Sequence, residues 1–119
     1  MRLGMIGLGR MGANMTTRLL AAGHQIVVYD RDDEVVKTAQ AGGAEGASTL
    51  QQVVDALPAP RVVWVMVPSG DPTEESVMSL AELMEPGDTI IDGGNSNYGE
   101  TIRRGRVLGE RGLHLVDVG

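Results

Sequence analysis

Segments with the patterns of β-strands and of α-helices alternate along the whole chain, and this alternation limits the fold more than any other feature. Residues 25–30 and 61–67 are apolar and rich in β-branched side chains, as strands are. Arg10–Ala22 instead carries apolar residues at helical spacing and is closed by Gly23. Because only a few residues connect successive segments, we expect parallel strands, right-handed crossovers and helices on both faces of one sheet.

The order of the segments predicts an α/β fold of the Rossmann type, with a doubly wound, mainly parallel six-stranded sheet and helices on both faces. The strand Arg61–Val67 is apolar on both faces, which predicts that both of its sides are covered. Ser48 or Thr49 can cap the third helix. The predicted strands are residues 2–7, 25–30, 44–46, 61–67, 88–92 and 113–118, and the predicted helices are 10–22, 32–41, 50–57, 98–111 and a segment that begins at Thr73.

Length and composition exclude several classes of protein. The 119 residues correspond to one domain, and the absence of cysteine excludes disulfides and thiolate zinc sites. His24 and His114 are far apart in the sequence, so we expect no metal site. A net charge of −6 argues against nucleic-acid binding. The longest apolar run, Val62–Val67, is too short to cross a membrane. Since no signal-peptide pattern begins the chain, we expect a cytoplasmic protein.

A glycine motif follows the first predicted strand and opens the first predicted helix. It consists of Gly7, Leu8, Gly9, Arg10, Met11 and Gly12 and fits the pattern G-x-G-x-x-G. In this pattern the first glycine permits a tight turn, the second lets the backbone approach a pyrophosphate, and the third lets the helix pack closely on its strand. The helix N-terminus then offers N–H groups to the phosphates. We predict a dinucleotide-binding loop; the alternative is a glycine turn that binds nothing.

The second predicted strand ends in Asp30, 18 residues after Gly12, near the spacing of about 20 expected for the residue that binds the adenosine ribose. A carboxylate there accepts hydrogen bonds from the ribose hydroxyls and repels a 2′-phosphate, which favours NAD. Arg31 complicates this prediction, because a neighbouring guanidinium can hold a 2′-phosphate. We therefore predict NAD as the cofactor, with NADP as the alternative. A solvated surface role for Arg31 stays open.

Two further loops come directly after predicted strands. Val67, Pro68 and Ser69 follow the fourth strand, and Asn95 lies in the glycine-rich segment after the fifth strand. In open α/β sheets ligands bind just beyond the carboxyl ends of the strands, so both loops are expected beside the cofactor. For each loop, an ordinary turn between a strand and a helix is the alternative.

Together these motifs resemble the β-hydroxyacid dehydrogenase superfamily and, within it, the 6-phosphogluconate dehydrogenase family. The discriminating segment is Ile90–Ser96, since hydroxyisobutyrate-type relatives usually have a Ser-Thr pair after the aspartate. The resemblance covers essentially the whole chain. The other matching segments are Gly4–Met15, Ala22–His24, Val28–Arg31, Trp64–Pro68 and Val116–Gly119.

The resemblance implies roles for individual residues. The glycine loop and Met11 would contact the dinucleotide, the position of Asp30 would set the choice between NAD and NADP, and residues 67–69 would lie along the cofactor. Asn95 would help to place the substrate and the nicotinamide. Members that use NADP often have Asn-Arg-Thr where this chain has Asp30-Arg31-Asp32, and this departure favours NAD.

The resemblance also implies the reaction, which is oxidative decarboxylation of 6-phosphogluconate to ribulose 5-phosphate and CO₂ in the pentose phosphate pathway. The family takes its catalytic Lys and Glu from a helical domain that follows the cofactor domain. We therefore expect residues 1–119 to be the dinucleotide-binding domain, with no catalytic residue and no turnover on its own. The full-length enzyme would be a homo-oligomer acting on a small sugar phosphate, and the fragment would be a monomer. The alternatives are another hydroxyacid dehydrogenase, such as a 3-hydroxyisobutyrate type, and a non-catalytic NAD(H)-sensing module.

Overall fold

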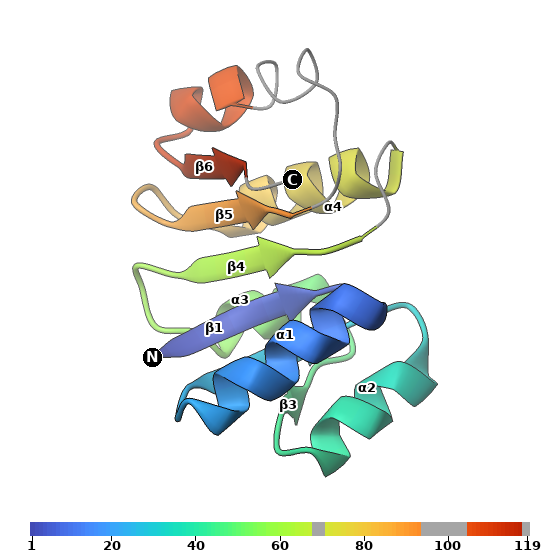
Figure 1. The fold of residues 1–119 in the computed structure, drawn as a ribbon. Coiled ribbons are helices and arrows are strands. Elements are labelled where there is room, and N and C mark those ends of the chain that lie inside the picture. The colour runs from blue at the N-terminus through green and yellow to red at the C-terminus, as the bar shows by residue number, and fades with distance from the viewer. Residues whose placement is uncertain (68–70, 94–104, 118–119) are drawn as a thin grey trace.

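The computed structural model describes residues 1–67, 71–93 and 105–117. Within this part of the chain, six parallel strands form one sheet in the order β3-β2-β1-β4-β5-β6 (Figure 1). This order confirms the doubly wound fold that the alternating pattern predicts. The strands are β1 (Arg2–Ile6), β2 (Gln25–Tyr29), β3 (Glu45–Gly46), β4 (Val62–Val65), β5 (Thr89–Asp92) and β6 (His114–Asp117).

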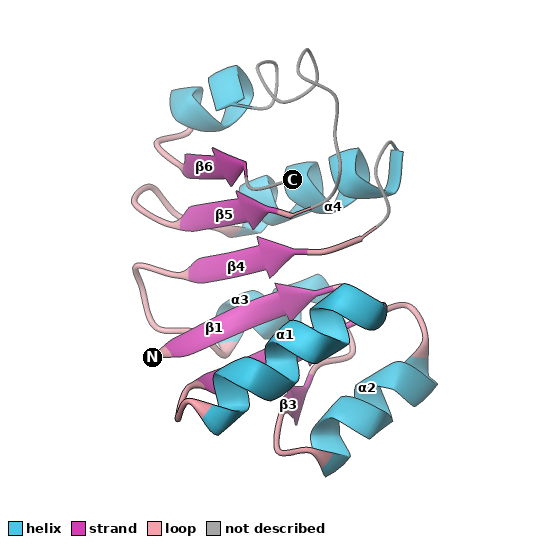
Figure 2. Cartoon of the chain, in the orientation of Figure 1, coloured by secondary structure: helices cyan, strands magenta, loops and turns pink. Residues whose placement is uncertain are grey.

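Helices cover both faces of the sheet, with α1 and α2 in front and α3 and α4 behind in Figure 2. Two of the helices begin at side-chain caps: Asp32 accepts a hydrogen bond from the Glu34 N–H at the start of α2, and Thr49 accepts one from the Gln52 N–H at the start of α3. These caps satisfy N–H groups that the helices themselves cannot pair. The helices are α1 (Arg10–Ala21), α2 (Asp33–Ala41), α3 (Leu50–Asp55) and α4 (Asp71–Leu83), and residues 105–110 are also helical.

The hydrophobic core lies on both faces of the sheet because successive side chains of a strand point to opposite faces. On one face, Ile6, Val63 and Val65 are fully buried with residues of α3 and α4. On the other face, Met5 and Val28 pack with residues of α1 and α2. A Cβ atom at Gly4 would lie 2.8 Å from Val53 Cγ1, so glycine is required where α3 packs on β1.

The structure corrects the predicted start of the fourth long helix and tests the prediction for β4. Helix α4 begins at Asp71 rather than Thr73 and so includes Pro72, which the first turn of a helix accommodates because its N–H groups lack partners within the helix. Strand β4 is covered on both faces, as its apolar sequence predicts: Val63 and Val65 are fully buried in one core cluster, and the partly buried Val62 and Trp64 pack against the other. Of the predicted helix 98–111, residues 98–104 lie outside the described residues.

Candidate dinucleotide site

The candidate site lies at the carboxyl ends of β1 and β4, where the order of the strands reverses. Strand β1 pairs with β2 on one side and with β4 on the other. The chain leaves β1 into α1 on one face of the sheet and leaves β4 towards α4 on the opposite face (Figures 1 and 2). The region beyond the carboxyl ends of these two strands is called the candidate crevice. Open α/β sheets bind ligands at such a switch point.

Each glycine of the motif occupies a different environment. Gly7 has a φ of +96°, and a Cβ atom there would lie 2.8 Å from the backbone carbonyl of Met66 at the end of β4. A Cβ atom at Gly12 would lie 2.1 Å from the Gly7 carbonyl oxygen. Gly9, in contrast, has no atom of the described structure within 4 Å of the corresponding position. Gly7 and Gly12 therefore let the loop pack, while Gly9 faces open space that a pyrophosphate could occupy.

The N-terminus of α1 lies directly beside Gly9. Gly9 is the N-cap of α1 and provides no side-chain hydrogen bond. The first turn of α1 contains no acidic residue. The side chain of Met11 in this turn is 67% exposed. Helices α2 and α3 both have side-chain caps at their N-termini. The N-terminus of α1 has none, so its positive end is available to bind an anion.

Asp30 joins the end of β2 to the glycine loop. Its Oδ2 accepts a hydrogen bond from the Leu8 N–H at 2.7 Å, and its Oδ1 accepts one from the Asp32 N–H at 2.9 Å. The Gly7 N–H donates to the Tyr29 carbonyl oxygen at 2.9 Å, which ties the two strand ends together. Because each carboxylate oxygen can accept a further hydrogen bond, Asp30 can hold the loop and still accept from the ribose hydroxyls.

Arg31 is exposed and extends to the other side of the crevice. Its Nη2 lies 3.6 Å from Oε2 of Glu75 in α4, and both side chains are more than 70% exposed. Sequence analysis did not identify Glu75 as a candidate site residue. The two residues are far apart in the sequence, so no local pattern links them.

The carboxyl ends of β4 and β5 complete the described part of the crevice. Val67 is partly buried, and its Cγ1 would lie 3.0 Å from a Cβ atom at Gly7. A Cβ atom at Gly93 would lie 2.2 Å from Met66 Sδ and 2.7 Å from Trp64 Nε1. Three predicted site residues, Pro68, Ser69 and Asn95, lie outside the described residues. Contact of all the candidate residues with a cofactor stays a prediction.

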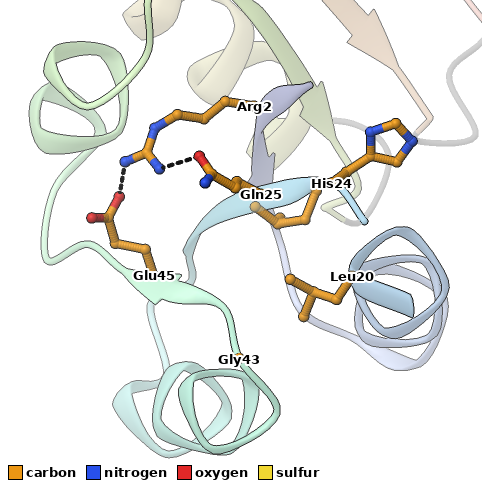
Figure 3. Close-up of a pocket in the computed structure, with 7 residues that line it drawn as sticks. Arg2, Leu20, His24, Gln25, Gly43 and Glu45 are labelled. Atoms are coloured by element: carbon orange, nitrogen blue, oxygen red, sulfur yellow. Dashed lines mark hydrogen bonds and ion pairs between the residues drawn. The ribbon is translucent and has the colours of Figure 1, made fainter. Parts of the chain in front are cut away.

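A cavity of about 230 Å³ lies at the opposite edge of the sheet, at the amino ends of the strands (Figure 3). Arg2, at the start of β1, forms an ion pair with Glu45 and donates hydrogen bonds to Gln25 and to the Ala56 carbonyl oxygen. These partners satisfy its guanidinium, so this cavity offers no free cation for a phosphate. We therefore expect a dinucleotide at the carboxyl ends of the strands rather than in this cavity.

In the part of the chain that the structure describes, His, Asp and Glu residues form no group of three that could hold a metal ion. None of the described helices combines the length and apolar character that a membrane span requires.

Comparison with known proteins shows the family of the chain. The model of one protein family, described as the NAD binding domain of 6-phosphogluconate dehydrogenase, matches residues 2–119. The NAD(+)-dependent, decarboxylating 6-phosphogluconate dehydrogenase of Haloferax volcanii is 41% identical over 104 residues, which are 87% of this chain and 35% of that protein. The chain spans between 26% and 40% of the length of the first curated relatives it matches.

Two solved structures show the same fold. The Plasmodium falciparum 6-phosphogluconate dehydrogenase, solved in its apo form, with its cofactor NADP+ and with its substrate, is 30% identical with a TM-score of 0.86, over 97% of this chain and 26% of that chain. The 3-hydroxyisobutyrate dehydrogenase of Mycobacterium tuberculosis, solved with L-serine, has a TM-score of 0.88 at 23% identity, over 98% of this chain and 39% of that chain. At that identity the likeness concerns the fold alone.

Proposed function

Because this chain belongs to the family of NAD-binding domains of 6-phosphogluconate dehydrogenase, we propose that it is the cofactor-binding part of an enzyme that oxidatively decarboxylates 6-phosphogluconate to ribulose 5-phosphate and CO₂, a reaction of the pentose phosphate pathway. The family is one of oxidoreductases, and the domain is an NAD(P)-binding domain. The substrate, the reaction and the choice between the two dinucleotides are the proposed part.

The observation that carries the proposal is the open glycine loop beside Asp30. Gly9 and the uncapped N-terminus of α1 face the crevice. The Asp30 carboxylate is fixed at its edge by the N–H groups of Leu8 and Asp32. Backbone N–H groups and a helix dipole suit a pyrophosphate, and a fixed carboxylate suits the ribose diol. A carboxylate at this position supports NAD over NADP, since it would repel a 2′-phosphate.

On this proposal the residues of this chain bind the cofactor. A bound nicotinamide would accept a hydride from the C3 carbon of the substrate. The chain's own residues would hold the dinucleotide: the glycine loop, from Gly7 to Gly12, at the pyrophosphate, Asp30 at the ribose, and residues 67–69 along its length. Asn95 would help to orient the substrate and the nicotinamide.

Proton transfer needs a general base and a general acid, and we propose that a Lys and a Glu of a following helical domain supply them. On this proposal residues 1–119 bind the cofactor but do not turn over substrate. The full-length enzyme would act on the small sugar phosphate as a homo-oligomer in the cytoplasm, whereas the fragment would be a monomer.

Turnover assays on two proteins test this function. The full-length gene product should reduce NAD⁺ with 6-phosphogluconate and release CO₂, and it should do so much faster than with 3-hydroxyisobutyrate. The 119-residue chain should form no ribulose 5-phosphate. A full-length product that is inactive on 6-phosphogluconate but active on 3-hydroxyisobutyrate would replace the proposal by the related dehydrogenase. Cofactor binding without activity on any hydroxyacid would favour an NAD(H)-sensing module.

A further inference from the structure

An exposed ion pair connects the two sides of the candidate crevice. Arg31 directly follows Asp30 at the end of β2, and Glu75 lies in α4, which follows β4. Strand β1 separates β2 from β4 in the sheet, so the pair links segments that are not neighbours there. The Arg31 Nη2–Glu75 Oε2 distance is 3.6 Å, and the two side chains are 76% and 71% exposed.

This pairing bears on how the site would treat a 2′-phosphate. An arginine next to the ribose-binding position is a suitable partner for that phosphate because its guanidinium can donate two parallel hydrogen bonds. In this structure the guanidinium of Arg31 faces a carboxylate instead. A phosphate that approached Arg31 would have to displace Glu75 and would also meet its negative charge.

We propose that Glu75 is a specificity-determining residue of the cofactor site, which biases the site against dinucleotides with a 2′-phosphate by occupying Arg31. The inference rests on the proposed dinucleotide site and adds to it a residue outside the glycine motif and outside the end of β2. It assigns to Arg31 a role different from simple phosphate capture: while Glu75 is present, the arginine is partly neutralised.

The size of the effect follows from the exposure of the pair. Exposed ion pairs are weak, so Arg31 can exchange Glu75 for a phosphate at small cost. The charge of Glu75 also repels a doubly charged phosphate several ångströms away. In a water-rich crevice, removing this charge would favour phosphate binding by a similarly small free energy. Together these effects predict that loss of the Glu75 charge tightens NADP⁺ binding by roughly three- to tenfold. NAD⁺, which has no 2′-phosphate, should keep its dissociation constant within about twofold.

The test is a side-by-side titration of the 119-residue chain and its Glu75→Gln variant with NAD⁺ and NADP⁺ at low ionic strength. Glutamine keeps the size of the side chain and removes only its charge. Glu82→Gln is the matched control, because Glu82 is an exposed acidic residue of the same helix and lies further along it. We expect the NADP⁺ constant to fall only in Glu75→Gln, and the effect to shrink at high salt, which screens exposed charges.

The double variant Arg31→Ala/Glu75→Gln separates pairing from simple repulsion. If Glu75 acts partly by occupying the guanidinium, Glu75→Gln should improve NADP⁺ binding less when Arg31 is absent. An unchanged NADP⁺ constant in Glu75→Gln, or an equal improvement for NAD⁺ and NADP⁺, would overturn the inference while leaving the proposed function standing. Failure of the unaltered chain to bind NAD⁺ would overturn the proposed function and the inference with it.

Discussion

Substituting Gly9 and Gly12 separately by alanine distinguishes a glycine needed for the ligand from one needed for the fold. At Gly9 an added Cβ meets no described atom within 4 Å, and the φ and ψ of −63° and −174° are accessible to alanine. Alanine is a poorer N-cap than glycine but restricts the unfolded chain, and these effects oppose each other. We expect the free energy of unfolding of Gly9→Ala to stay within about 0.5 kcal/mol of the unaltered chain.

Gly12→Ala is expected to behave differently because its Cβ would lie 2.1 Å from the Gly7 carbonyl oxygen. Atoms at that distance must move apart by about 1 Å, which would shift α1 relative to the loop or distort the turn at Gly7. Forced shifts of this kind in a packed region cost roughly 1–3 kcal/mol or more. We therefore expect Gly12→Ala to lower the free energy of unfolding by at least about 2 kcal/mol.

Urea unfolding and NAD⁺ titration of both variants give the comparison. Gly9→Ala should unfold like the unaltered chain but bind NAD⁺ at least about tenfold more weakly, because a methyl group would fill the space in which the backbone approaches the pyrophosphate. Gly12→Ala should be less stable in urea and should also bind NAD⁺ more weakly. If Gly9→Ala binds NAD⁺ normally, or if it loses as much stability as Gly12→Ala, the reasoning about the loop is wrong.

Three further predictions use other parts of the structure. In titrations, Asp30→Ala should weaken NAD⁺ binding and raise the affinity for NADP⁺ relative to NAD⁺. In unfolding experiments it should lose about 1–2 kcal/mol of stability, because two backbone hydrogen bonds to the carboxylate are lost. Asp88→Ala should lower the free energy of unfolding in urea by roughly 3–5 kcal/mol, because the buried carboxylate pairs with Arg61 and accepts a hydrogen bond from the Glu85 N–H. Unchanged stability would refute this. Trp64 is the single tryptophan and lies beside Gly93, so bound NADH should quench its fluorescence; full emission with NADH bound would contradict the placement.

The fold could be predicted from the sequence because its main signals are local. Apolar runs such as Arg61–Val67 and the helical spacing of Arg10–Ala22 reflect which faces are buried, and the turn glycines lie between them. The start of α4 is harder to predict, because a proline breaks the interior of a helix but fits its first turn, where Pro72 lies.

The candidate site could be predicted only in part. The spacing of the glycines and Asp30 placed them at one edge of the sheet, and the structure brings them together through the hydrogen bond from Leu8 to Asp30. The pairing of Arg31 with Glu75 could not be predicted, because it depends on how two exposed side chains from separate elements meet across the crevice. No periodicity or motif encodes such a contact.

Calorimetric titration of the 119-residue chain with NAD⁺ and NADP⁺ measures whether the glycine loop and Asp30 form a dinucleotide site. We predict saturable one-to-one binding with preference for NAD⁺. At about 100 times its dissociation constant the ligand should add roughly 2.7 kcal/mol of stability. In a domain of this size that raises the melting temperature by about ten degrees or more. Absence of heat and of any thermal shift with both dinucleotides would contradict binding at this loop.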